Sequence, residues 1–210
     1  MKIAHIADTH IRNYNYHKEY REIFESIYDR LREEKVDYIV HCGDLAHTKT
    51  QLSPEYFDLA TSFLKNLADI APTYLILGNH DGNLKNDNRQ DAVTPIVNAL
   101  RHPNLNLLKN AGETIVNGNI AFNVLSVFDE ENWVKPSSNK RINIALYHGS
   151  VSGVKTDTGW VMTHGDHPIT VFEGHDYVFL GDIHKTNQIL DDEGRVRYPG
   201  STVQQNFGET

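Results

Sequence analysis

Short apolar segments of this chain end repeatedly in side chains that can bind metal ions. Carboxylate, imidazole and amide groups follow five such segments: Asp8 and His10; Asp44; Asn79, His80 and Asp81; His148; and Asp182 and His184. Oxygen and imidazole donors without thiolates suit Mn, Fe, Zn or Mg. Seven of these residues are candidate ligands, all but His80 and Asp81. Seven are too many for one ion with open positions, so the set indicates two ions that share a carboxylate.

The first 77 residues contain the elements that must position these groups. Residues 17–35 have apolar side chains at helical spacing, and Ser53-Pro54 supplies an N-cap serine and an N1 proline for a second helix. With strands expected at 2–7, 36–41 and 74–77, this order predicts right-handed βαβ crossovers whose strands end at one edge of a sheet. Side chains i and i+2 of an extended strand end point the same way, which predicts that Asp8 and His10 face one ion.

Beyond residue 100 the pattern changes from βαβ units to hairpins. A short helix is expected over 92–100, and Asn117-Gly118 is typical of a two-residue hairpin turn. The remaining expected strands cover 104–109, 113–116, 120–127, 142–146, 177–180, 188–190 and 195–198.

Composition limits the class of protein. A chain of 210 residues with 39% hydrophobic content is expected to form one domain, 1–210. The formal net charge of −8 argues against a broad basic surface that grips nucleic acid, although bound metal ions can reverse the local field. No apolar stretch is long enough to span a membrane and no signal peptide is visible, so the expected compartment is the cytoplasm. The single cysteine, Cys42, is expected to be a small buried apolar residue.

Taken together, the motifs resemble those of the calcineurin-like metallophosphoesterases over nearly the whole chain. They are Asp8-x-His10, Gly43-Asp44, Gly78-Asn79-His80-Asp81, His148 and Gly181-x-x-His184. Three further stretches are similar to the SbcD-type DNA nucleases of double-strand-break processing complexes, including phage-encoded relatives. These are Asp44-Leu45-Ala46-His47, residues 181–185 and Tyr198-Pro199-Gly200-Ser201.

The resemblance implies a fold, an activity and partners. The implied fold is a four-layer α/β/β/α sandwich of two mixed sheets flanked by helices, and the implied activity is hydrolysis of DNA phosphodiester bonds with manganese as the usual ion. It further implies dimerisation and a partner ATPase of the SbcC type. Relatives continue into a capping domain and helices that dock the ATPase, so this chain is expected to lack that C-terminal region. One ion would be held by Asp8, His10, Asp44 and His184, and the other by Asp44, Asn79, His148 and Asp182.

A mechanism can be argued beside the resemblance. Two cations lower the pKa of a bridging water, so that a hydroxide nucleophile exists near neutral pH. His80 follows the ligand Asn79 directly and is expected to act as general acid toward the leaving oxygen. Asp81 is expected to fix the tautomer of His80 and raise its pKa, and His47 to orient the substrate. Contacts to DNA phosphates are assigned, on weaker grounds, to Lys185, Arg195 and Arg197.

One residue departs from the SbcD-type pattern. Asp182 stands where that pattern usually has histidine. Because a carboxylate is a harder, charged ligand, it predicts a bias toward Mn or Mg over Zn.

Two other functions remain open at this point. One is a phosphoesterase of the same fold that acts on a small molecule or a phosphoprotein, because fold does not determine substrate. The other is a non-catalytic module that binds DNA ends or a partner, with Asp182 having disabled one metal site.

Overall fold

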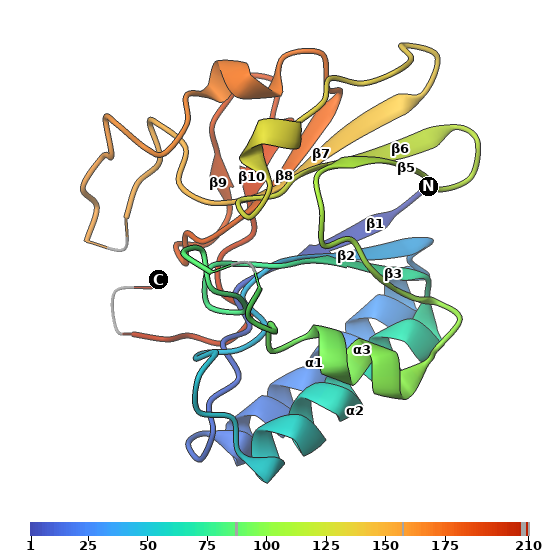
Figure 1. Ribbon diagram of the computed structural model, residues 1–210, viewed down its shortest axis with the longest axis vertical. Coiled ribbons are helices and arrows are strands. Elements are labelled where there is room, and N and C mark those ends of the chain that lie inside the picture. The colour runs from blue at the N-terminus through green and yellow to red at the C-terminus, as the bar shows by residue number, and fades with distance from the viewer. Residues whose placement is uncertain (87, 157, 207–208, 210) are drawn as a thin grey trace.

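Two β-sheets packed face to face form the centre of the protein, as the computed structural model shows (Figure 1). The structure describes residues 1–86, 88–156, 158–206 and 209. The first sheet has four strands in the order β1 (Ile3–Ile6), β2 (Tyr38–Cys42), β3 (Thr73–Ile76) and β4 (Leu105–Leu107). The second sheet has six, in the order β5-β6-β7-β8-β10-β9.

Three helices cover the outer face of the first sheet: α1 (His17–Glu34), α2 (Pro54–Ile70) and α3 (Thr94–Leu100) (Figure 1). The rings of Phe24 and Phe63 stack between α1 and α2 with centroids 4.1 Å apart. The predicted start of α2 is confirmed, because the Ser53 hydroxyl accepts a hydrogen bond from the Tyr56 backbone N–H at 3.1 Å. The helices thus bury one face of the sheet and leave the other for the second sheet.

The four-stranded sheet is parallel throughout. The predicted βαβ crossovers are therefore present, and β1, β2 and β3 end at one edge. The expectation that both sheets are mixed was wrong for this one. The connections from β1 to β2, β2 to β3 and β3 to β4 each contain a helix, which returns the chain to the starting edge of the sheet.

The six-stranded sheet is mixed. Its strands are β5 (Gly112–Ile115), β6 (Ile120–Leu125), β7 (Ile142–His148), β8 (Tyr177–Gly181), β9 (Gln188–Ile189) and β10 (Val196–Tyr198). The two predicted hairpins, β5-β6 and β9-β10, are antiparallel, and the other pairs are parallel. The first hairpin turn is longer than predicted. The Val116 N–H donates to the Ile120 carbonyl at 2.9 Å, so the turn also includes Asn119.

The outer face of the second sheet is covered by irregular chain and two short 3-10 helices, η1 (Glu130–Asn132) and η2 (Ile169–Phe172). Val151, Val154 and Phe172 pack here against strand residues such as Leu180 and Val196. The four-layer α/β/β/α arrangement is therefore confirmed, with an outer layer of 3-10 turns and loops on this side. No helix in the described ranges is both long enough and apolar enough to cross a membrane.

The space between the sheets is filled by small and branched side chains. Val40 and Ile76 of the first sheet pack with Phe122, Ile144 and Leu146 of the second. Cys42 lies in the same layer without a disulfide and is completely buried, as predicted. This packed layer holds the two sheets together at the edge where the polar strand ends meet.

His5 links the two sheets and should make the protein sensitive to acid. Its Nε2 lies 2.9 Å from the Leu180 carbonyl, and its ring stacks on Phe179 at 4.6 Å. Burial, partly offset by that hydrogen bond, lowers the pKa of His5 to about 4. The unfolded chain therefore binds more protons than the folded one between pH 6.5 and about 4, and stability falls as the pH falls through this window.

We expect His5→Gln, whose amide can donate the same hydrogen bond, to remove this dependence. The free energy of unfolding of the wild type should fall relative to that of the variant by about 3 kcal/mol between pH 7 and pH 4. Urea titrations in EDTA at several pH values measure the difference. If the unfolding free energies of the two proteins change equally with pH between pH 7 and pH 4, the assignment to His5 is contradicted.

Candidate metal centre

The polar strand ends converge at one edge of the two sheets. The Asp8 N–H donates to the Gly43 carbonyl at 3.1 Å, which joins the segments after β1 and β2. The Asp182 N–H donates to the Asp8 carboxylate at 3.0 Å, which joins the segment after β8 to the first sheet. Residues far apart in the chain thus contribute side chains to one buried cluster.

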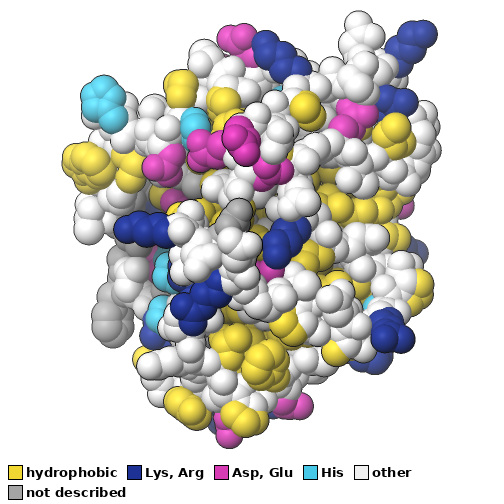
Figure 2. All heavy atoms as spheres, viewed as in Figure 1, with side chains coloured by type: hydrophobic (Ala, Val, Ile, Leu, Met, Phe, Trp, Pro, Cys, Tyr) yellow, Lys and Arg dark blue, Asp and Glu magenta, His cyan; other side chains and the backbone are white. Residues whose placement is uncertain are grey.

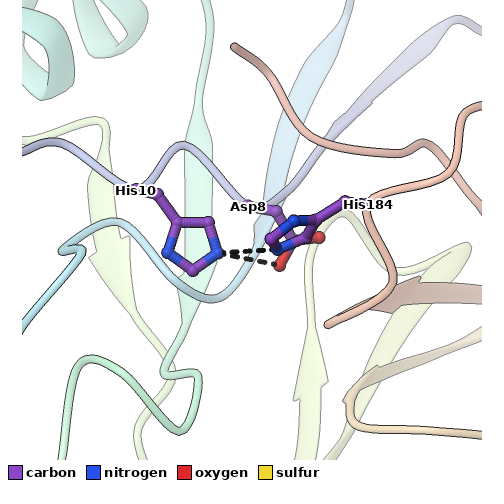
Figure 3. Close-up of side chains that lie close together, drawn as sticks. All are labelled: Asp8, His10 and His184. Atoms are coloured by element: carbon purple, nitrogen blue, oxygen red, sulfur yellow. Dashed lines mark hydrogen bonds and ion pairs between the residues drawn. The ribbon is translucent and has the colours of Figure 1, made fainter. Parts of the chain in front are cut away.

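One part of this cluster consists of Asp8, His10 and His184 (Figure 3). Figure 3 shows the three side chains pointing toward one another, from the segments that follow β1 and β8. His10 Nε2 lies 2.9 Å from His184 Nε2 and 3.9 Å from Asp8 Oδ1. One nitrogen or oxygen atom of each lies within 4.8 Å of the others, the spacing of donors around a single ion.

The second part is centred on His148. Its Nε2 lies 3.4 Å from Asp44 Oδ2 and 3.8 Å from Asp182 Oδ1. The same Asp44 oxygen lies 3.5 Å from His10 Nε2 of the first part. The Asn79 side-chain oxygen is buried nearby and lines the same cavity as His148 and Asp182. Asp44 therefore stands between the two groups of donors, where a shared ligand would be required.

The backbone at the centre is left-handed, which corrects the argument used to place Asp8 and His10. Their φ angles are 52° and 48°, so the segment after β1 is coiled and not extended. Asp44 and Asp182 also have positive φ, at 57° and 97°. Such conformations are unfavourable for residues other than glycine and concentrate at functional sites. The side chains of Asp8 and His10 therefore reach the centre because the backbone turns tightly after β1, and not because side chains alternate along a strand.

Three glycines make room for the His148 ring. A Cβ atom on Gly43 would lie 2.5 Å from its Nδ1, one on Gly78 2.7 Å from its Cε1, and one on Gly181 2.8 Å from its Nδ1. All three distances are shorter than a Cβ contact allows. This explains why Asp44, Asn79 and Asp182 are each preceded by glycine.

Buried nitrogen and oxygen atoms without hydrogen bonds show that metal ions fit the centre. His148 Nδ1 lies 2.7 Å from the Cys42 carbonyl, which accepts its proton, so that the neutral ring presents a lone pair on Nε2. Among the described residues, His148 Nε2 and Asn79 Oδ1 are buried without a hydrogen-bond partner, which is costly unless a ligand occupies the site. Both atoms are therefore available as ligands.

The charge of the cluster leads to the same conclusion. Asp8, Asp44 and Asp182 form no ion pair with lysine or arginine within the described part of the chain. Burial raises the pKa of Asp8 well above its ordinary value, and the negative charge of Asp44 adds to this shift. Divalent cations would supply the missing positive charge.

The structure places His80 at the centre but gives Asp81 a different partner from the one predicted. His80 Nδ1 is bonded to the His47 carbonyl at 2.8 Å, and its Nε2 has no hydrogen bond within the described part of the chain. Asp81 is fully buried, and its carboxylate accepts backbone N–H groups of Gly78, Asp44 and Ala46 at 2.9–3.0 Å. The predicted Asp81–His80 contact is therefore wrong, because these hydrogen bonds use the carboxylate to join the segments after β2 and β3.

Two cavities open onto the centre. One, of about 420 Å³, is lined by Asn79, His148 and Asp182 together with Glu130 and His167. The other, of about 380 Å³, is lined by His47, Lys49, Asn79 and His80 among others. A substrate can thus approach from either side of Asn79.

The cationic residues at these cavities differ from those predicted. Lys49 lies at the second cavity and donates to the Asn79 carbonyl at 2.7 Å, a residue that sequence reasoning missed although it lies two positions after His47. Arg195 is ion-paired with Glu193 at 2.8 Å, and Arg197 donates to the Gly194 carbonyl. Neither arginine lines the two cavities at the centre, because both belong to the β9-β10 hairpin. Lys185 follows His184 and is half-buried.

Comparison with known proteins matches residues 1–186 to the calcineurin-like phosphoesterases. A protein of Acanthamoeba polyphaga mimivirus is 41% identical over 99% of this chain. The DNA double-strand break repair protein Mre11 of Saccharolobus solfataricus is 26% identical over 93% of it. This chain spans only 16% of the first protein and 52% of the second.

Among solved structures, an archaeal phosphodiesterase aligns over 96% of this chain and 84% of its own, at 12% identity and a TM-score of 0.43. The family match covers most of the chain and includes every predicted metal ligand. The family and the donor geometry together identify a centre for divalent metal ions. The chain belongs to the calcineurin-like phosphoesterase family.

Proposed function

We propose that this protein hydrolyses DNA phosphodiester bonds with two divalent ions, as an exonuclease, an endonuclease or both. The reaction would serve the processing of DNA ends in repair or recombination. The observation that carries the proposal is the position of Asp44, whose Oδ2 lies 3.5 Å from His10 and 3.4 Å from His148. A carboxylate between two sets of donors is the arrangement that a pair of ions requires. The similarity to Mre11 supports DNA as the substrate.

The residues of this chain would divide the work as follows. Asp8, His10, Asp44 and His184 would hold one ion, and Asp44, Asn79, His148 and Asp182 the other. When bound, the ions would activate a water molecule for attack and neutralise charge on the phosphate. His80, whose Nε2 has no hydrogen bond among the described residues, would donate a proton to the departing sugar oxygen. His47 and Lys49, which line the adjoining cavity, would orient the substrate backbone.

The surface around the centre is compatible with a nucleic acid despite the net charge of −8. Figure 2 shows Lys and Arg side chains gathered across the middle of one face, close to histidines, with acidic side chains above them. A local cationic band can contact phosphates even on an acidic protein. We further propose that the protein works as a homodimer together with an SbcC-type ATPase.

The deciding experiment compares three substrates. With Mn²⁺, the protein should release nucleotides from linear duplex DNA and cleave the diester bis-p-nitrophenyl phosphate, and both activities should stop in EDTA. A phosphomonoester should be a poor substrate. Preference for the monoester with intact DNA would instead indicate a phosphoesterase for small molecules or phosphoproteins, and binding of DNA ends without hydrolysis would indicate a non-catalytic module.

Asp182 should set the preference for the metal. Its carboxylate Oδ1 lies 3.8 Å from His148 Nε2 and adds a hard, negatively charged donor. We expect Mn²⁺ or Mg²⁺ to support at least about tenfold higher activity than Zn²⁺. Asp182→His should shift the preference toward Zn²⁺. Apo protein titrated with each ion gives the measurement, and highest activity with Zn²⁺ in the wild type would count against the role of Asp182.

A further inference from the structure

Glu209 is a buried carboxylate beside the metal centre that sequence reasoning did not single out. Its side chain is only 1% exposed, and its Oε1 lies 3.0 Å from His184 Nδ1. Glutamate is rarely buried to this extent without a specific partner. The burial of Glu209 against His184 therefore needs a physical explanation.

Four donor groups converge on this carboxylate. Besides His184, Oε1 accepts the Asn206 side-chain amide at 2.7 Å, and Oε2 accepts the Gln205 N–H at 2.8 Å and the Ser201 hydroxyl. An ionised carboxylate can accept all of these hydrogen bonds, because it has only acceptor sites. A neutral amide would place donor hydrogens against donors.

The segment that carries Glu209 is attached to the same strand end as Asp8. The Thr202 N–H donates to the Asp8 carbonyl at 3.2 Å, and the Thr202 hydroxyl donates to the Ala7 carbonyl at 2.7 Å. The Ser201 N–H donates to the His184 carbonyl at 3.1 Å. Because the Ser201 hydroxyl also donates to Glu209, the carboxylate is tied directly to this anchored stretch.

We infer that Glu209 is a positioning residue that orients His184 for metal binding. By accepting the Nδ1 proton, it holds the imidazole in the tautomer whose Nε2 has a lone pair, and Nε2 is the atom that faces His10. The negative charge also makes Nε2 a stronger donor to a cation. This inference rests on the proposed metal centre and extends it to the segment after residue 200.

The test is the binding of Mn²⁺, measured by titration calorimetry without any substrate. Removing the carboxylate partner of a metal-bound histidine typically costs 10–100-fold in affinity. We expect Glu209→Gln to lower the affinity for one of the two Mn²⁺ ions by about this factor and to change the affinity for the other less than about threefold. The matched control is Glu131→Gln, the same change at an exposed position, which should leave both affinities unaltered.

A second variant separates orientation from packing. Ser201→Ala removes one hydrogen bond to Glu209 but keeps the contact with His184, so metal affinity should stay within about threefold. A loss equal to that of Glu209→Gln would show that the segment acts only by packing. Unchanged Mn²⁺ affinities in Glu209→Gln would also overturn the inference. In that case the proposed function would still stand, provided that the wild type binds two ions. A wild type that binds no Mn²⁺ would refute both.

The imidazole itself gives a readout that packing does not change. In the metal-free wild type, the ¹⁵N shifts of His184 should show a proton held on Nδ1. In Glu209→Leu, which offers no acceptor to Nδ1, the proton should be shared between Nδ1 and Nε2. Identical shifts in the two proteins would overturn the inference even if their stability differed.

Discussion

Asp44→Asn is expected to lower the rate of DNA hydrolysis at least about a thousandfold, equivalent to about 4 kcal/mol of transition-state stabilisation. The reason is the place of its carboxylate, 3.5 Å from His10 Nε2 and 3.4 Å from His148 Nε2. A single substitution there weakens both proposed ion positions, whereas loss of Asp182 affects one. Mn²⁺ titration should show that tight binding of the ion pair is lost, and a nuclease assay at saturating Mn²⁺ should show the loss in rate.

Asparagine is the substitution that leaves the surrounding structure intact. Asp44 has a left-handed backbone with φ 57°, a conformation that asparagine adopts as readily as aspartate. Its Oδ1 accepts the His80 N–H at 2.8 Å, a bond that an amide oxygen can also make. The exposed Asp192→Asn, which removes the same charge, is the control and should retain full activity. Tight binding of two ions by Asp44→Asn would exclude Asp44 as the shared ligand.

Strand ends were predictable from the sequence because sheet architecture determines where they lie. Parallel strands joined by helices must end at one edge, so the apolar segments before Asp8, Asp44 and Asn79 were enough to bring these residues together. The approach of His148 and Asp182 depends on the packing of a second sheet against the first. Only the family resemblance supplied that information, because no spacing in the sequence specifies how two sheets are packed.

Other contacts at the site could not be predicted from the types and spacing of residues in the sequence. The burial of Asp81 depends on backbone N–H groups from two separate segments, and backbone donors have no signature in the residue types. The left-handed φ of Asp8 and His10 likewise depends on the hydrogen bonds between the segments after β1 and β2. Glu209 lies 25 residues from His184, and neither its burial nor its partner follows from composition.

His80→Gln is expected to separate proton donation from metal binding. A positioned general acid typically contributes 10²–10⁴-fold to the rate, so DNA hydrolysis should fall by about that factor while both Mn²⁺ affinities stay unchanged. The variant keeps the backbone N–H that His80 donates to Asp44 Oδ1, so the metal centre should retain its geometry. The matching variant His47→Gln, at the adjoining cavity, should raise KM more than it lowers kcat, because His47 is proposed to orient the substrate.

The leaving group makes this prediction specific. The sugar oxygen of DNA is a poor leaving group that needs a proton, whereas p-nitrophenolate departs without one. Hydrolysis of bis-p-nitrophenyl phosphate by His80→Gln should therefore fall less than about tenfold, far less than hydrolysis of DNA. A nitrogen of His80 lies within 4.8 Å of donor atoms on His10 and Asp44, so the two assays together distinguish proton donation from metal binding. If His80 binds an ion instead, both substrates should lose the same factor and the Mn²⁺ affinity should fall with them.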